Sequence, residues 1–187
     1  MIMPRNAFPN LPMVGVEDGS FQKGITIKTV LAAVLFRNLH IEDVKVKKIT
    51  VDGFEATERL KEMLSSWNFE AVLLAGISFA GFNVIDPILI HEEFNKPVII
   101  ITRTKPNNKA VKKALEKHFE DWKRRFEVFE KIGLPYERLS FAGKSPVYVK
   151  AIWASFNWAC TLIHGSSILG VVPEPLRVAR LIARGLS

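Results

Sequence analysis

Acidic residues recur in this chain at the points where apolar strands are expected to end. The run Met13-Val14-Gly15-Val16 is followed at once by Glu17 and Asp18, and then by a glycine. Further acids stand at later strand ends: Asp52 and Glu55 between the third expected strand and its helix, and Asp86 after the fourth. Because α/β folds keep their sites at strand ends, we expect any chemistry at this edge. Taken alone, Asp18-Gly19 would equally suit a solvated turn.

Carboxylates that converge from neighbouring strands suit the cleavage of a phosphodiester. That reaction needs hard oxygen ligands for Mg²⁺ or Mn²⁺, which activate water and neutralise charge in the transition state. The candidate catalytic residues are therefore Glu17, Asp18, Asp52, Glu55 and Asp86. The candidate metal ligands are Glu17, Asp18 and Asp52, and the spacing leaves open which of the first two binds the metal.

Other chemical motifs are incomplete. Residues 76–81 have the glycine spacing of a phosphate-binding loop, but Phe82 and Asn83 stand where Lys and Ser or Thr are required. The chain also contains neither a Gly-x-Gly-x-x-Gly fingerprint nor a His-Glu-x-x-His pattern. These observations argue against a nucleotide triphosphatase, a dinucleotide-dependent oxidoreductase and a zinc protease.

The order of the expected elements indicates the fold class. An antiparallel meander is predicted first, then an amphipathic helix from Phe54 to near Asn68, and then alternating buried strands and helices. The meander covers residues 13–16, 25–36 and 41–51; the later strands cover 71–75, 97–101 and 146–152; the later helices cover 87–94, 108–132, 156–163 and a segment from Pro173. This is the order of an α/β, ribonuclease H-like mixed sheet with flanking helices, and we expect one domain over residues 1–187.

Composition narrows the partners and the compartment. A formal charge of +7 favours a polyanionic partner, with nucleic acid first among them. A single cysteine, Cys160, rules out an internal disulfide. Residues 1–11 lack the apolar core of a signal peptide, and no later segment is apolar for the roughly 18–20 residues that cross a bilayer. We therefore expect a soluble, cytoplasmic protein.

The last expected helix has a basic face. Arg177, Arg180 and Arg184 are spaced i, i+3 and i+7, so they share one side and could grip phosphates. A solvated helix face is the alternative interpretation of the same spacing.

Four stretches resemble the archaeal endonuclease dU family, which is related to endonuclease V. They are residues 15–21 (GVEDGSF), 51–57 (VDGFEAT), 80–86 (AGFNVID) and 173–179 (PEPLRVA). The resemblance spans nearly the whole chain in the expected order. It implies a ribonuclease H-like fold and a metal-dependent endonuclease that acts in DNA repair on DNA containing deoxyuridine.

The chain departs from the family pattern at two positions. The first motif of the family resembles Asp-Asp-Gly, whereas Glu17 here is one methylene longer. In endonuclease V the strand matching residues 72–75 ends in a catalytic aspartate before glycine, but this chain has Ala75. That change removes a ligand unless Glu55 or Asp86 substitutes for it.

Three hypotheses follow. In the first, the chain is a Mg²⁺- or Mn²⁺-dependent endonuclease in which Asp86 completes or orients the site and Asn83 positions a base or a metal-bound water. Arg103 and Lys105 would then hold the phosphate backbone together with the arginines of the last helix. The second is a catalytically inactive nucleic-acid-binding protein on the same fold, and the third is an assembly protein whose basic surface binds RNA. A gathering of the five carboxylates would favour the first, because a binding module has no reason to collect mutually repelling acids.

Overall fold

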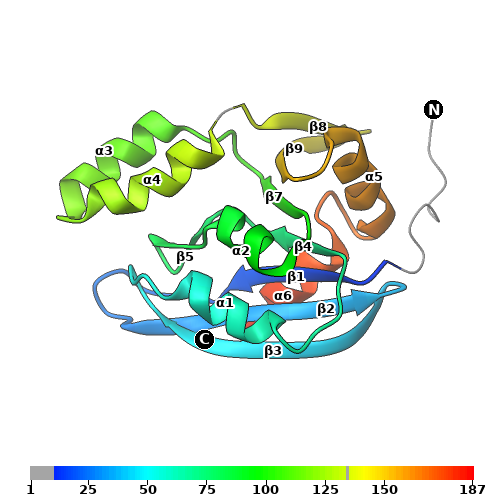
Figure 1. The fold of residues 1–187 in the computed structure, drawn as a ribbon, viewed down its shortest axis with the longest axis horizontal. Helices are drawn as coiled ribbons and strands as arrows, with labels where there is room; N and C mark the ends of the chain where they lie inside the picture. Colours follow the sequence, from blue (N-terminus) through cyan, green and yellow to red (C-terminus); the bar gives the residue numbers. More distant parts are fainter. Residues whose placement is uncertain (1–10, 134) are drawn as a thin grey trace.

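The computed structural model describes residues 11–133 and 135–187, and its centre is a seven-stranded mixed sheet (Figure 1). The strand order is β3-β2-β1-β4-β7-β9-β8. The strands are β1 (Met13–Asp18), β2 (Lys28–Arg37), β3 (His40–Thr50), β4 (Ala71–Leu74), β7 (Val98–Thr102), β8 (Glu137–Phe141) and β9 (Lys144–Ile152). The expectation that the chain has no signal peptide falls largely on residues 1–10, which lie outside the described residues.

Strand direction explains why the acids of β1 lie at a functional edge. The first three strands form the expected antiparallel meander, in which Asp18 pairs with Leu31 of β2. β4 and β7 run parallel to β1, and Val72, Leu73 and Leu74 are fully buried, as expected for strands covered on both faces. The carboxyl ends of these three parallel strands therefore share one edge of the sheet.

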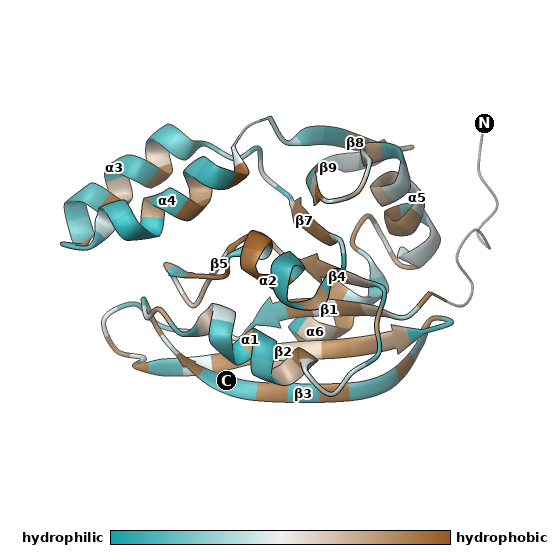
Figure 2. Ribbon diagram, in the orientation of Figure 1, coloured by the Kyte–Doolittle hydropathy of each residue, from teal (hydrophilic) through white to brown (hydrophobic). Residues whose placement is uncertain are grey.

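Helices cover both faces of the sheet. They are α1 (Ala56–Leu64), α2 (Pro87–Phe94), α3 (Asn108–His118), α4 (Trp122–Ile132), α5 (Phe156–Ser166) and α6 (Glu174–Gly185). One buried cluster joins the sheet to α1, α2, α3 and α4, and a second joins its other face to α5 and α6. The central strand β4 is largely apolar, whereas α3 and α4 are mostly hydrophilic (Figure 2). No helix of the described ranges is long and apolar enough to cross a membrane.

The long helix predicted over residues 108–132 was wrong, because the chain breaks between α3 and α4. Phe119 adopts an extended conformation (φ −137°, ψ 126°) and packs its ring edge-on against Phe82, with centroids 5.6 Å apart. An unbroken helix of this length would extend about 37 Å, whereas the break divides the segment into two shorter helices, α3 and α4. Folding back at Phe119 keeps these rings in the first buried cluster.

Two strand features differ from the sequence-based expectation. The segment after β4 contains a two-stranded hairpin, β5 (Ser78–Phe79) and β6 (Asn83–Val84), which is too short to give a periodic signal. β8 was also missed, because only Leu139 of it is fully enclosed and its composition is polar. Asp86 consequently follows β6 rather than a strand of the main sheet.

Glycine allows α6 to lie directly on β1. A Cβ added at Gly15 would stand 2.2 Å from the carbonyl carbon of Pro175, and one at Gly19 would stand 2.7 Å from the carbonyl oxygen of Ala183. Both distances are shorter than van der Waals contact. The first and last family-like stretches are therefore in backbone contact, and α6 runs alongside β1 toward the edge that holds Glu17 and Asp18.

Candidate active site

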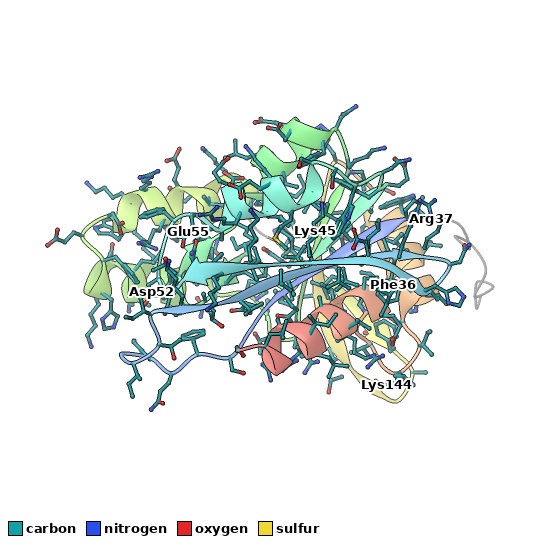
Figure 3. All side chains as sticks on the ribbon, turned by 90° about the horizontal axis from the view of Figure 1, so that it is seen from below. Phe36, Arg37, Lys45, Asp52, Glu55 and Lys144 are labelled. Atoms are coloured by element: carbon teal, nitrogen blue, oxygen red, sulfur yellow. The ribbon has the colours of Figure 1, made fainter. Side chains whose placement is uncertain are left out.

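Asp18 and Asp52 are bound to one short turn, although Asp18 ends β1 and Asp52 lies in the turn after β3. The backbone N–H of Ala80 donates to Asp18 Oδ2 at 2.6 Å, and the N–H of Phe82 donates to Asp52 Oδ1 at 2.8 Å. The N–H of Asp52 in turn donates to the carbonyl oxygen of Ala80 at 2.8 Å. The hairpin turn between β5 and β6 thus holds both aspartates at the expected edge. Figure 3 shows Asp52 at the end of the sheet opposite Arg37.

The turn requires glycine at its centre. Gly81 has φ +83°, and an added Cβ there would lie 2.2 Å from Asp52 Oδ1. Ala80 and Asp52 also adopt positive φ, at 44° and 58°, which costs non-glycine residues about 1–2 kcal/mol each. The glycine spacing that resembled a phosphate-binding loop therefore serves a turn whose amides bind carboxylates of the protein itself.

Glu17 and Asp18 are half-buried acids whose charges are not fully compensated. Burial, followed by the neighbouring charge of Asp18, raises the pKa of Glu17 to about 7, although Arg180 and Arg184 oppose this shift. Burial also raises the pKa of Asp18 above its ordinary value, despite the hydrogen bond from Ala80. Two such acids side by side are typical of a site that receives a cation or a proton.

Glu55 and Asn83 brace the turn after β3. Glu55 accepts hydrogen bonds from the N–H groups of Thr50 at 2.6 Å and Phe54 at 2.9 Å. Burial alone would raise the pKa of Glu55, but these hydrogen bonds outweigh it and lower the pKa to about 2. Asn83 is fully buried; it donates to Thr50 and Glu55 and accepts from the N–H of Ala56. Both side chains fix the segment that carries Asp52.

Asp86 caps α2. Its carboxylate accepts from the N–H groups of Ile88 at 2.9 Å and Leu89 at 3.4 Å, and its own N–H donates to Thr57 Oγ1. Aspartate at this position satisfies the free N–H groups of a first helical turn. The structure thus gives Asp86 a role in building the fold and shows no contact between it and Asp18 or Asp52.

The basic residues predicted to bind phosphate divide into two groups. Arg180 and Arg184 lie close enough to Glu17 to lower its pKa, and Arg103 and Lys105 are exposed just after β7, at the same sheet edge. Arg177 lies about two helical turns before Arg184, near the start of α6. It binds the buried carboxylate of Glu174 at 2.7 Å. The helical spacing was therefore read correctly as one face, but only part of that face adjoins the acids.

A gathering of the five carboxylates, which would favour the nuclease hypothesis, is not observed among the described residues. Among residues 11–133 and 135–187, no group of three or more His, Cys, Asp or Glu side chains is arranged to hold a metal ion. Asp18 and Asp52 share a turn and Glu17 adjoins Asp18, whereas Glu55 and Asp86 are occupied by backbone N–H groups. Sequence reasoning could place acids at strand ends but could not tell a ligand from a cap.

The chemistry of the remaining acids suits a divalent cation. Asp18 and Asp52 each use one carboxylate oxygen on the turn, and a carboxylate has about four lone-pair sites. A cation would also relieve the repulsion and desolvation that raise the pKa of Glu17 and Asp18. Glu17, Asp18 and Asp52 do not form a ready-made three-ligand site, so their role as ligands of an oxygen-seeking metal such as Mg²⁺ or Mn²⁺ stays a prediction from their chemistry.

Sequence reasoning missed one residue of this region, Arg125 of α4. Arg125 is 5% exposed, and it donates to the carbonyl oxygens of Gly53, which follows Asp52, and of Phe82, whose N–H binds Asp52. Arg124 and Arg125 are neighbours in a helix rich in charged residues, so the sequence offered no signal that separated buried Arg125 from exposed Arg124.

Solved structures define the class of protein to which this fold belongs. A protein of unknown function from Archaeoglobus fulgidus is similar with a TM-score of 0.80 and 25% identity, covering 92% of this chain and 96% of its own. Endonuclease V from Ciona intestinalis, in complex with DNA containing inosine, is similar with a TM-score of 0.61 and 14% identity, covering 96% and 86%. The chain has the ribonuclease H-like fold of endonuclease V.

The family is narrower than the fold. The family model described as Endonuclease dU matches residues 9–187, and a UPF0215 protein from Thermococcus sibiricus is 35% identical over 97% of this chain and 94% of its own length. The chain therefore belongs to the endonuclease dU family, as its four stretches indicated.

Proposed function

We propose that the protein is a metal-dependent endonuclease that cleaves DNA containing deoxyuridine in cytoplasmic DNA repair. The observation that carries this proposal is the binding of Asp18 and Asp52 to one turn, with the half-buried acid Glu17 alongside. Membership of the endonuclease dU family and the endonuclease V fold support the same reaction class. Deoxyuridine as the substrate rests on the family alone.

Each group at the edge has a role in this reaction. Glu17, Asp18 and Asp52 would hold Mg²⁺ or Mn²⁺, which when bound supplies charge neutralisation and a more acidic water. The turn at Ala80–Phe82 fixes the aspartates before the metal arrives, so little reorganisation accompanies binding.

Cations beside the acids would hold the substrate. Arg180 and Arg184 face Glu17 from α6, and Arg103 and Lys105 are exposed after β7. These four cations adjoin the acids, so they would position a DNA backbone over the acids without reading its sequence.

The proposal is tested by nicking of a labelled duplex that contains one deoxyuridine. The measurement compares Mg²⁺, Mn²⁺ and chelator, and uses matched duplexes in which the base is thymidine or inosine. We expect metal-dependent nicking of the deoxyuridine duplex above both controls. Equal nicking of all three duplexes would refute the specificity, and no metal-dependent nicking of any would refute the nuclease.

One observation favours a second function, a binding protein without catalysis. Ala75 directly follows β4, where endonuclease V has an acid, and the described residues do not gather three acidic or histidine ligands. A folded protein that binds DNA with a strong dependence on salt, but does not nick it, would establish this alternative.

A further inference from the structure

Arg125 connects the two segments that hold the aspartates. One of its terminal nitrogens, Nη1, donates to the carbonyl oxygen of Gly53 at 2.9 Å and to that of Phe82 at 2.8 Å. Gly53 directly follows Asp52, and the N–H of Phe82 is the group that binds Asp52 Oδ1. A single guanidinium on α4 therefore joins the turn after β3 to the turn between β5 and β6.

The side chain of Arg125 is fixed by two aromatic rings and a carboxylate. The guanidinium carbon lies 3.9 Å from the ring centroid of Phe54 and 4.3 Å from that of Phe119. Asp121, at the N-cap of α4, binds it at 2.8 Å to Nε and 3.2 Å to Nη2. Two aromatic faces and a carboxylate compensate the buried charge, so the fork of donors is fixed in direction.

Arginine is suited to this position for a geometric reason. A planar guanidinium can bind two carbonyl oxygens and a carboxylate while its faces lie against two rings, whereas the ammonium of lysine is a compact charge on a flexible stem. Arg124 provides a comparison, because its guanidinium lies 4.5 Å from the same Phe54 ring but it is exposed. Burial and the two carbonyl contacts distinguish Arg125 from its neighbour.

We infer that Arg125 is a positioning residue that sets the relative placement of Asp18 and Asp52 and, through it, the affinity of the site for its metal. This inference rests on the proposed function for its consequence in catalysis, but not for its structural content. The α3 and α4 hairpin, which lies on the side of the molecule to which β1 points (Figure 1), then acts as a brace for the site.

The test compares Arg125→Lys and Arg125→Met with the control Arg124→Met in the full chain. Three quantities are measured. They are the hydrogen-exchange rates of the Ala80 and Phe82 amides, the affinity for Mn²⁺, monitored by the electron paramagnetic resonance of the free ion, and the thermal midpoint of unfolding. Because residues that orient metal ligands without touching the metal typically change its affinity by 10–100-fold, we expect Arg125→Lys to weaken Mn²⁺ binding at least about tenfold. Its Ala80 and Phe82 amides should exchange faster, and Arg124→Met should match the native chain in both.

A structural role alone gives a different pattern. If Arg125→Lys lowers the thermal midpoint but leaves Mn²⁺ binding and the exchange of the two amides unchanged, the inference is overturned. Should Arg125→Met fail to fold, Arg125→Lys still provides this test. Nicking separates the inference from the proposed function. If the native chain binds Mn²⁺ but does not nick DNA, and Arg125→Lys weakens Mn²⁺ binding, the positioning role is supported and the nuclease proposal is contradicted.

Discussion

The conformation of single residues determines whether the acids of this chain can act together. Asp52, Ala80 and Gly81 all have positive φ, and through them two aspartates from distant sequence positions meet the same backbone turn. Strained backbone of this kind persists where the surrounding structure over-determines it, often at functional sites. Here Glu55, Asn83 and Arg125 supply that support.

Gly81→Ala should disrupt the site more than the backbone angle alone explains. Gly24 is the matched control, because its φ of +80° is similar but an added Cβ would meet nothing within 4 Å. Gly24→Ala should cost about 1–2 kcal/mol of unfolding free energy, the general penalty of this conformation. Gly81→Ala should cost more, because its Cβ would displace Asp52, and should also weaken Mn²⁺ binding. Chemical denaturation and metal titration measure both, and equal effects of the two variants would contradict the proposed contact.

The raised pKa of Glu17 predicts how stability depends on pH. The ordinary pKa is 4.5 and the folded value is about 7, so the folded state binds the proton more tightly. Glu17 therefore favours folding below about pH 4.5, and this contribution is lost as pH rises to about 7.

Glu17→Gln, which remains neutral, should consequently raise the thermal midpoint of the metal-free protein at pH 8 and change it little at pH 4.5. The rise should be a few degrees, since about 1 kcal/mol corresponds to about 2–4 °C for a chain of this size. Added Mn²⁺ should stabilise the native chain at pH 8 more than the variant. A variant that is less stable than the native chain at pH 8 would contradict the burial of an uncompensated charge.

At the scale of elements, α6 and the α3 and α4 hairpin bring residues to an edge that the first strands create. α6 reaches β1 because Gly15 and Gly19 leave room for its backbone. Figure 3 shows α6 and α1 on opposite sides of the strands, so the edge receives groups from both faces. On the arginine face of α6, Arg177 binds Glu174, whereas Arg180 and Arg184 lie nearer Glu17.

Substitutions on α6 should separate DNA binding from stability. Arg180→Gln with Arg184→Gln should weaken DNA binding in chelator and reduce the dependence of log Kd on log salt by about two, one for each lost phosphate contact. Arg177→Gln should leave that slope unchanged. It should instead lower the unfolding free energy by about 1–3 kcal/mol, because Glu174 is buried and would lose its partner. An equal loss of slope in both variants would show that all of this face meets DNA.

Periodicity predicted most elements, while tertiary contacts decided the others. The meander, the buried strands β4 and β7 and the amphipathic α1 and α6 follow from local patterns. The break at Phe119 depends on its contact with Phe82, 37 positions away by number, and the short β5 and β6 depend on pairing with each other. Local sequence carries no signal for such partners.

At the scale of the whole molecule, the sequence placed the acids at one edge but could not assign their roles. Asp18 and Asp52 were among the five candidates, and the structure brings them to one turn. Glu55 and Asp86 have the same chemistry and similar positions after strands, yet they bind backbone N–H groups. A carboxylate that caps and a carboxylate that ligates differ only in what surrounds them, and Arg125 was missed for the same reason.

The most direct test of the central claim is the nicking rate of Asp52→Ala against that of Asp86→Asn on the deoxyuridine duplex with Mg²⁺. Asparagine also caps helices well, so Asp86→Asn should fold and retain most of the native rate. Asp52→Ala should fold but lose nicking by about 100-fold or more, as expected when transition-state charge stabilisation is removed. Retention of activity in Asp52→Ala, or its loss in Asp86→Asn, would contradict the assignment of Asp18 and Asp52 as the centre of the site.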